Sequence, residues 1–317
     1  MKFGLDDQQR DFAASIDAAL SGAGVPAAVR AWAAGDFAPG RKVWAQLAEL
    51  GVTALNVPET HGGLAAHTSD LVVALERLGR WCVPGPVAES IAVAPLLLTD
   101  GKRCAALASG ELIATVAMPP LMPRAVDAEA AGLALLATDD GVTEAALGTR
   151  CDSVDPSRRL FEVTAAGERW HADVKRASEF GALATGALLV GAAQALLDIT
   201  VEYAKQRTQF GRVIGSYQAI KHKLADVHIA VELARPLVYG AALSLADNSS
   251  EIARDVSAAK VAAAEAALLA ARSALQTHGA IGFTAEHDLS LWLLRVQALR
   301  SAWGDPAAHR RRVLAAL

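Results

Sequence analysis

The feature that most constrains this chain is a run of four long segments with helical periodicity after Ser178. Apolar residues recur in each segment every three or four positions, and few glycines or prolines interrupt them. Alanine, the strongest helix former, supplies much of the apolar content. Short loops join the segments, which makes neighbouring helices antiparallel. We therefore predict a bundle of four helices, at residues 181–207, 217–247, 251–278 and 285–303.

Two regions of different character precede this bundle. Residues 1–100 again show helical periodicity, and Ser69-Asp70 is a candidate cap for a helix over 71–78. Between about 112 and 163, short apolar runs alternate with Pro, Gly and Asp, a pattern typical of short strands. We predict a mainly α chain with a small antiparallel sheet or partial barrel. Its domains are a helical domain at 1–100, a small β domain at 101–176 and the C-terminal four-helix bundle at 177–317.

Charge and composition argue against several classes of protein. The 317 residues carry a formal net charge of −4, so no broad basic field exists to attract nucleic acid. The three cysteines are far apart, and neither His222 nor His278 has a second metal ligand at suitable spacing, so we predict no metal site. The uncharged stretch 181–197 reaches Asp198 before it could span a bilayer, which favours a buried helix over membrane insertion. The first residues do not resemble a signal peptide, and we expect a cytoplasmic protein.

The strongest candidate binding site is the junction between the first two long segments, where residues 207–218 read RTQFGRVIGSYQ. Arg207 offers a planar pair of donors for a pyrophosphate, Gln209 can form hydrogen bonds, and Phe210 presents a flat face to an adenine or flavin ring. Taken singly, Arg207 could pair with Glu202 and Phe210 could fill the core. The combined pattern favours nucleotide binding.

Two further segments strengthen this interpretation. Residues 276–284 read QTHGAIGFT and would bring a polar side chain and bare backbone close to a nucleotide, and residues 57–63 read VPETHGG. With the LAD that follows at 224–226, these three motifs resemble the signatures R-x-Q-F-G-x-x-I-x-x-x-Q, Q-x-x-G-G-x-G-[FY] and V-P-E-x-x-G-G of acyl-CoA dehydrogenases. Their order, in a helical–strand–helical layout, matches that family over nearly the whole chain.

The resemblance implies an acyl-CoA dehydrogenase-like fold and FAD as the cofactor. It further implies that one group of residues reaches across a subunit interface to the ADP half of an FAD held mainly by a neighbouring subunit. These residues are Arg207, Gln209, Phe210, Gln276, Gly279 and Ala280.

The catalytic base of the family is missing from its usual positions. The reaction removes a proton from the carbon alpha to a thioester while hydride passes from the beta carbon to flavin, and a carboxylate takes the proton. Counted from Arg295, the usual position of the base falls at Gly304, and the position used by some relatives falls at about Gly181. Asp305 and Glu179 lie close in sequence and would serve under a shifted alignment, although capping or solvated roles beside helix ends are the simpler interpretation.

The β region also departs from the family pattern. The T-E-P-x-x-G-S-D and W-I-T-N-G stretches that hold the isoalloxazine are missing, and residues 117–120 read AMPP where the first should begin. The shortfall resembles the short subunit of heteromeric acyl-CoA dehydrogenases from actinobacterial steroid catabolism. That resemblance implies an α2β2 heterotetramer in which a full-length partner supplies the flavin-ring site and the base.

The sequence therefore predicts a subunit, inactive alone, of a complex that desaturates an acyl-CoA such as a steroid or cholesterol catabolite. An electron-transferring flavoprotein is the expected electron acceptor. Two other interpretations stay open: a non-catalytic structural or regulatory homologue, and a self-sufficient homo-oligomeric flavoenzyme that uses Asp305 or Glu179.

Overall fold

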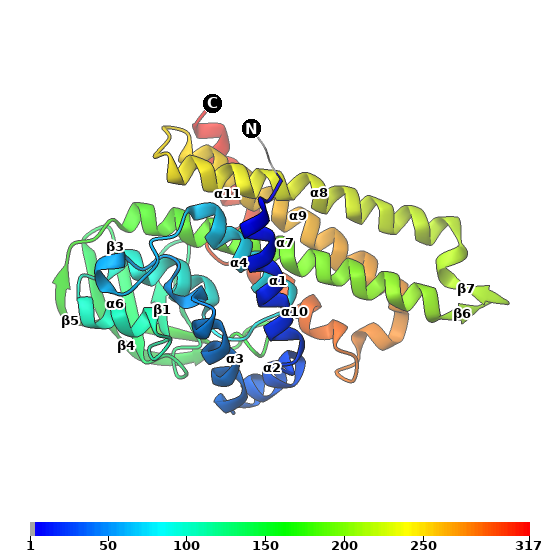
Figure 1. Ribbon diagram of the computed structural model, residues 1–317, viewed down its shortest axis with the longest axis horizontal. Helices are drawn as coiled ribbons and strands as arrows, with labels where there is room; N and C mark the ends of the chain where they lie inside the picture. The colour runs from blue at the N-terminus through cyan, green and yellow to red at the C-terminus, as the bar shows by residue number, and fades with distance from the viewer. Residues whose placement is uncertain (1–3) are drawn as a thin grey trace.

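One long helix, α7 (Val174–Gln206), runs through the centre of the molecule and packs against most of the other elements (Figure 1). The computed structural model describes residues 4–317. The most apolar window of α7 is 94% buried within the protein, so its length and hydropathy serve a protein core here. Helix α4 (Thr68–Arg80) crosses it closely, because a Cβ at Gly191 would collide with the Glu76 carbonyl and one at Gly79 with that of Leu188.

The predicted C-terminal helices are all present. After α7 come α8 (Gln218–Ala246), α9 (Ile252–His278) and α10 (Leu289–Ser301). The prediction missed a short additional helix, α11 (Pro306–Ala315), which begins with an Asp305 cap and a proline in its first turn. It also placed the start of α7 seven residues late, because the helix begins at Val174 with Asp173 as its cap.

The N-terminal helices pack on one side of α7. The proposed Ser69-Asp70 cap was wrong, because α4 starts at Thr68 and the His67 side chain accepts from the Ser69 amide. Helical structure also continues past residue 100. The remaining elements are α1 (Asp7–Ser21), α2 (Val25–Ala34), α3 (Ala38–Glu49), the short turns η1 (Val52–Ala54) and η2 (Glu59–His61), the π-helical turn η3 (Ala88–Val93) with α5 (Ala94–Leu97), and α6 (Gly101–Ala108).

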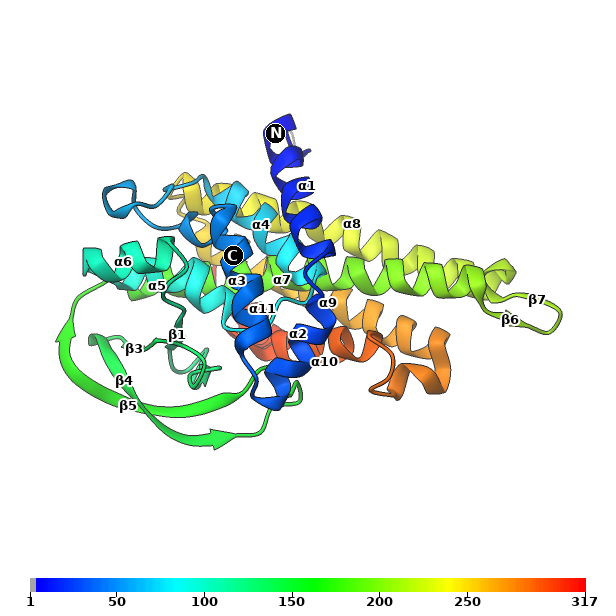
Figure 2. The ribbon, with the colours of Figure 1, turned by 60° about the horizontal axis from the view of Figure 1, so that its bottom comes forward.

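A five-stranded sheet lies at one end of the molecule, in the order β1-β3-β4-β5-β2 (Figures 1 and 2). The expected antiparallel pairing holds for most of it, but β1 pairs with β3 in parallel. The prediction missed β4, because half of that strand is solvent-exposed and lacks an apolar run. The strands are β1 (Ala114–Ala117), β2 (Ala125–Val126), β3 (Leu133–Thr138), β4 (Gly141–Cys151) and β5 (Leu160–Trp170).

Arg295 on α10 ties the three regions together. Its guanidinium is buried and donates to Asp155 Oδ2 at 2.6 Å, to Ser157 Oγ at 3.0 Å and to the Val83 carbonyl at 2.9 Å. Burial alone would raise the pKa of Asp155, but the charge of Arg295 and hydrogen bonds from Ser157 and Arg295 outweigh it and lower that pKa. One side chain thus joins the bundle to the sheet loop and to the N-terminal helices.

The turn between α10 and α11 is held by a second buried group, His309. Its Nε2 lies 2.8 Å from the Trp303 carbonyl, and its Nδ1 lies 3.1 Å from Ser257 Oγ on α9. Burial lowers the pKa of His309 to about 4; the hydrogen bond to the Trp303 carbonyl opposes this shift, and the positive charge of Lys260 adds to it. The imidazole is therefore neutral in the folded protein at pH 7, with Nε2 as the donor.

We expect Arg295→Met to destabilise the protein by about 3–5 kcal/mol, because Asp155 would stay buried without its counter-ion. Urea unfolding at pH 7 measures this change. Arg254→Met is the matched control, since Arg254 pairs with Glu251 on the surface, where such pairs contribute at most about 1 kcal/mol. Equal, small losses in both variants would contradict the role given to Arg295.

We expect His309 to make the fold acid-sensitive between about pH 6.5 and pH 4. An ordinary histidine in the unfolded chain gains a proton in this range, whereas the folded state resists it, so stability is lost as the pH falls. The full effect is about 3 kcal/mol. Urea unfolding at pH 7, 5.5 and 4 should show a smaller acid loss for His309→Gln, which keeps a donor for the Trp303 carbonyl; an unchanged loss would refute the assignment.

Candidate functional site

The motif at 207–218 forms a small hairpin that projects from the end of α7, far from the sheet (Figures 1 and 2). Its strands are β6 (Thr208–Gln209) and β7 (Arg212–Val213). Phe210 and Gly211 form the turn with φ of +52° and +81°, as in the type I′ turns that suit two-residue hairpins. Glycine adopts this conformation freely, but phenylalanine does so at a cost.

The hairpin is anchored from below by Tyr217. Its hydroxyl donates to the Gln209 carbonyl at 3.2 Å, and its ring lies 4.0 Å below the Arg212 guanidinium. The Ile214 amide donates to the Arg207 carbonyl at 2.8 Å and closes the base of the loop. These contacts hold Phe210 outward, where 93% of its surface is exposed.

The two plain alternatives for this motif do not hold. Phe210 fills no core, and Glu202 pairs with Lys205 at 2.6 Å rather than with Arg207. Within residues 4–317, the exposed Arg207 side chain forms no ion pair. A fixed loop thus presents an uncompensated guanidinium and a bare aromatic ring to its surroundings.

The second motif shapes the end of α9. The helix stops at His278, and Gly279 follows with φ +66° and ψ −139°, a conformation essentially restricted to glycine. Gln276, Gly279 and Ala280 are exposed, and the short turn η5 (Gly279–Phe283) leads on toward α10.

Two contacts bring these motifs to the same end of the molecule. Tyr203, in the last turn of α7, stacks on the His278 ring at a centroid distance of 4.1 Å. Lys223, near the start of α8, donates to Gln276 Oε1. We use the term hairpin surface for the six exposed residues on this end: Arg207, Gln209, Phe210, Gln276, Gly279 and Ala280.

The histidines beside this surface do not form a metal centre. His278 is buried, as expected for a packing residue, and desolvation lowers its pKa, a shift that the Ala274 carbonyl opposes. In the part of the chain from residue 4 onward, no group of three His, Cys, Asp or Glu side chains could hold a metal ion.

An apolar stripe runs along α8 from the hairpin end. Ile229, Leu233 and Leu237 are exposed at four-residue spacing and therefore lie on one helix face. The most apolar window of α8 is long and hydrophobic enough for a membrane span, yet only 39% of it is buried within the chain. An exposed apolar stripe of this kind marks a surface that another molecule covers.

The third motif, at 57–63, does not join the hairpin surface. It forms η2 and a turn that folds back on itself, where a Cβ on Gly63 would collide with the Val57 carbonyl. A Cβ on Gly101, at the start of α6, would lie 2.8 Å from His61 Nδ1. The motif therefore packs beside α6, at the end of the molecule that holds the sheet (Figure 1).

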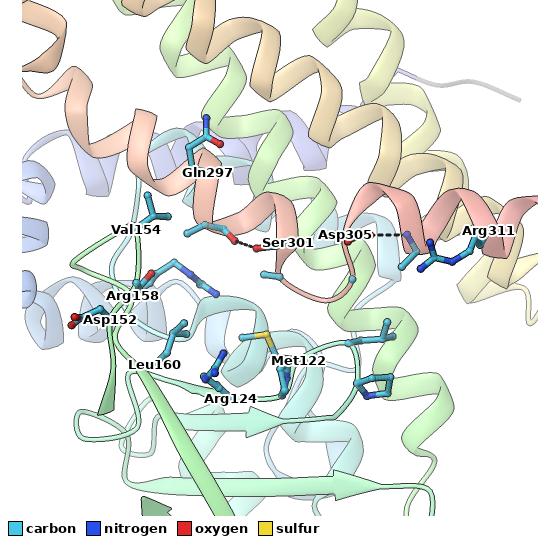
Figure 3. A pocket seen from close by; sticks show the side chains of 18 residues that line it. Met122, Arg124, Asp152, Val154, Arg158, Leu160, Gln297, Ser301, Asp305 and Arg311 are labelled. Atoms are coloured by element: carbon cyan, nitrogen blue, oxygen red, sulfur yellow. Dashed lines mark hydrogen bonds between the residues drawn. The ribbon is translucent and has the colours of Figure 1, made fainter. Parts of the chain in front are cut away.

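The usual position of the family base lies elsewhere, at a cavity of about 570 Å³ between the sheet and the α10–α11 turn (Figure 3). Gly304 lines it with φ +96°, and a Cβ there would lie 2.7 Å from His309 Nε2. Asp305 also lines it, and its carboxylate caps α11 by accepting from the Ala308 amide at 2.6 Å. The capping role expected for Asp305 is therefore present.

The alternative base position is closed by a tryptophan. A Cβ on Gly181 would collide with the ring of Trp303, so the two glycines lie on either side of one buried indole. Glu179 lies within α7 rather than beside its end, where it is buried and paired with Arg312.

Sequence analysis missed one carboxylate near these positions, Glu89. Its Oε1 accepts from Trp303 Nε1 at 2.9 Å, its Oε2 has no partner in the described chain, and the residue is fully buried. A lone acidic residue in the apolar run AESIAVAPLLL was the available signal. Because Glu89 reaches neither solvent nor the cavity, it cannot serve as a base in this chain.

Comparisons with known proteins agree with the fold and the motifs. Residues 6–103 match the acyl-CoA dehydrogenase N-terminal domain, and residues 171–317 match the acyl-CoA dehydrogenase C-terminal domain. Acyl-CoA dehydrogenase IpdE2 of Mycobacterium tuberculosis (strain ATCC 25618 / H37Rv) is 32% identical over 314 residues, which cover 96% of this chain and 94% of that protein.

Two solved structures share the fold at low sequence identity. The ChsE4-ChsE5 complex from Mycobacterium tuberculosis superposes with a TM-score of 0.83 at 23% identity, covering 99% of this chain and 98% of that one. A variant of the Tcur3481-Tcur3483 steroid ACAD superposes with a TM-score of 0.84 at 19% identity, covering 98% and 97%. From its matched domains and its relatives, this chain belongs to the acyl-CoA dehydrogenase family, whose members are FAD-dependent oxidoreductases.

Proposed function

We propose that this chain is a subunit of a heteromeric, FAD-dependent acyl-CoA dehydrogenase. Its hairpin surface contacts the ADP half of an FAD that a longer partner holds, and the partner supplies the catalytic base. The observation that carries this proposal is the hairpin itself, which holds a free arginine and a 93% exposed phenylalanine in a fixed position. Such a loop gains nothing within its own chain.

The residues of the hairpin surface fit the chemistry of a dinucleotide. Arg207 can grip a pyrophosphate through two parallel hydrogen bonds, and Phe210 can stack on a flat ring. Gly279 leaves the backbone open, since a Cβ placed there would meet nothing within 4 Å. When bound, FAD would supply the hydride acceptor of the reaction, and the residues of this chain would bind and orient it.

The absence of a base favours a partner. Gly304 cannot accept a proton, Trp303 fills the space beside Gly181, and Asp305 is engaged at a helix N-terminus. A partner also accounts for the exposed stripe of Ile229, Leu233 and Leu237 on α8. We propose an α2β2 heterotetramer, and two proteins of the same fold are named as two-protein assemblies, ChsE4-ChsE5 and Tcur3481-Tcur3483.

We propose that the complex introduces an α,β double bond into a bulky acyl-CoA, of the steroid or cholesterol-catabolite class. The name of the Tcur3481-Tcur3483 protein, a steroid ACAD, supports this class of substrate. An electron-transferring flavoprotein would reoxidise the flavin, and the complex would work in the cytoplasm. Purification separates the alternatives: a colourless chain that forms a yellow, active complex only with a longer homologue supports the proposal, whereas a yellow and active chain alone supports a self-sufficient enzyme.

We expect Arg207→Ala to weaken FAD retention in the co-expressed complex. Loss of a charge-assisted contact to the pyrophosphate costs about 1.5–3 kcal/mol. The ratio of FAD to protein after gel filtration, measured by absorbance, checks this. Lys205→Ala is the control, because Lys205 is a nearby exposed cation that already pairs with Glu202. Full FAD content in the Arg207 variant would favour a non-catalytic structural or regulatory subunit.

We expect Gly304→Glu to leave the isolated chain inactive. The new side chain would start from a backbone with φ +96° and crowd His309 Nε2, so the variant should also lose stability. Acyl-CoA-dependent dye reduction and thermal melting measure the two effects, and Gly304→Ala controls for the backbone strain alone. Dehydrogenase activity in the isolated Glu variant would refute the view that this half lacks a complete site.

A further inference from the structure

The cavity beside Gly304 carries a buried charge that nothing in the chain neutralises. Arg158 lies on its wall and is only 4% exposed, yet no hydrogen bond or ion pair from any residue between 4 and 317 reaches its guanidinium. The neighbouring Arg159 is equally buried but pairs with Glu129, and Arg295 pairs with Asp155. Burial of an unpaired guanidinium is expensive, so Arg158 indicates a missing anion.

The rest of the cavity supports an anionic ligand. Arg124 and Arg311 also line it, against the carboxylates of Asp152 and Asp305, and Asp305 is already committed to the α11 cap. Figure 3 shows Arg158 and Arg124 directed into the space between the sheet and α10. The balance of charge in the cavity is therefore positive, with the most buried cation at its inner wall.

The cavity is also large and partly apolar. Its volume of about 570 Å³ is that of a typical small-molecule site. Leu121, Met122, Val154 and Leu160 form apolar parts of the wall, and Ser301 and Gln297 add hydrogen-bonding groups on α10. Inorganic phosphate alone would leave the apolar surface uncovered.

We propose that this cavity binds a small organic anion with an apolar body, whose carboxylate or phosphate lies on Arg158. The site is formed by one chain and needs neither FAD nor the partner. It occupies the place where the family carries its base, so this half would hold a ligand there without transforming it. The proposal stands even if the hairpin surface binds no FAD.

Calorimetric titration of the full chain in an anion-poor buffer tests the site. The probes are octanoate, octyl phosphate, inorganic phosphate and the neutral octanamide. We expect saturable binding of octanoate or octyl phosphate, and their relative affinity identifies the acidic group. Inorganic phosphate should bind more weakly, and octanamide should not bind measurably. Equal binding of octanoate and octanamide would overturn the proposal.

Variants assign the binding to the arginines. Arg158→Met should weaken binding of the anionic probes at least tenfold, and Arg311→Gln should weaken it measurably. Arg310→Gln is the control on the same helix, because Arg310 faces Glu265 outside the cavity. Wild-type affinity in both the Arg158 and Arg311 variants would overturn the proposal.

Thermal melting separates binding from a structural role. In the anion-poor buffer, Arg158→Met should melt at the wild-type temperature or above it, since it removes an unpaired buried charge. Saturating octanoate should raise the melting temperature of the wild type but not that of this variant. A large drop for Arg158→Met, together with unchanged octanoate binding by Arg311→Gln, would assign Arg158 to folding and reject the site.

Discussion

The buried pair between Arg295 and Asp155 is the interaction on which the arrangement of this protein depends. Arg295 sits on α10, Asp155 in the loop before β5, and the Val83 carbonyl beyond the end of α4, so one guanidinium bonds to all three regions of the chain. Both charges are desolvated and each needs the other. The pair therefore sets how the sheet, the bundle and the N-terminal helices meet, and with them the walls of the cavity near Gly304.

The molecule separates two kinds of surface. At one end, the hairpin presents Arg207 and Phe210 to the outside, anchored by Tyr217. Near the sheet, the region where the family places its base is closed by Trp303 against Gly181, and the remaining cavity faces Arg158. A chain built in this way retains the means to contact a dinucleotide while it has lost the means to take a proton from a thioester. That division of roles is what a heteromeric enzyme requires of its non-catalytic half.

Much of the candidate site was open to prediction because it is local. The motif at 207–218 contains its own turn, and the positive φ of Gly211 follows from the two-residue hairpin that the glycine permits. The expectation that Gly279 opens the backbone rests on the same local logic. Arg158 and Glu89 escaped notice because their importance depends on burial and on missing partners. A charged residue reads as an ordinary surface group until its surroundings are known.

The sequence by itself determined the helical bundle, the presence of a small sheet, the family and the absence of a carboxylate at Gly304 and Gly181. These follow from periodicity, turn residues and residue identity, which are properties of short segments. Tertiary structure alone decided that the two glycines share one indole, that the motif at 57–63 lies far from the hairpin, and that Arg158 has no counter-ion. The reason is that contacts between distant segments depend on how complete elements pack, and no local pattern encodes that packing.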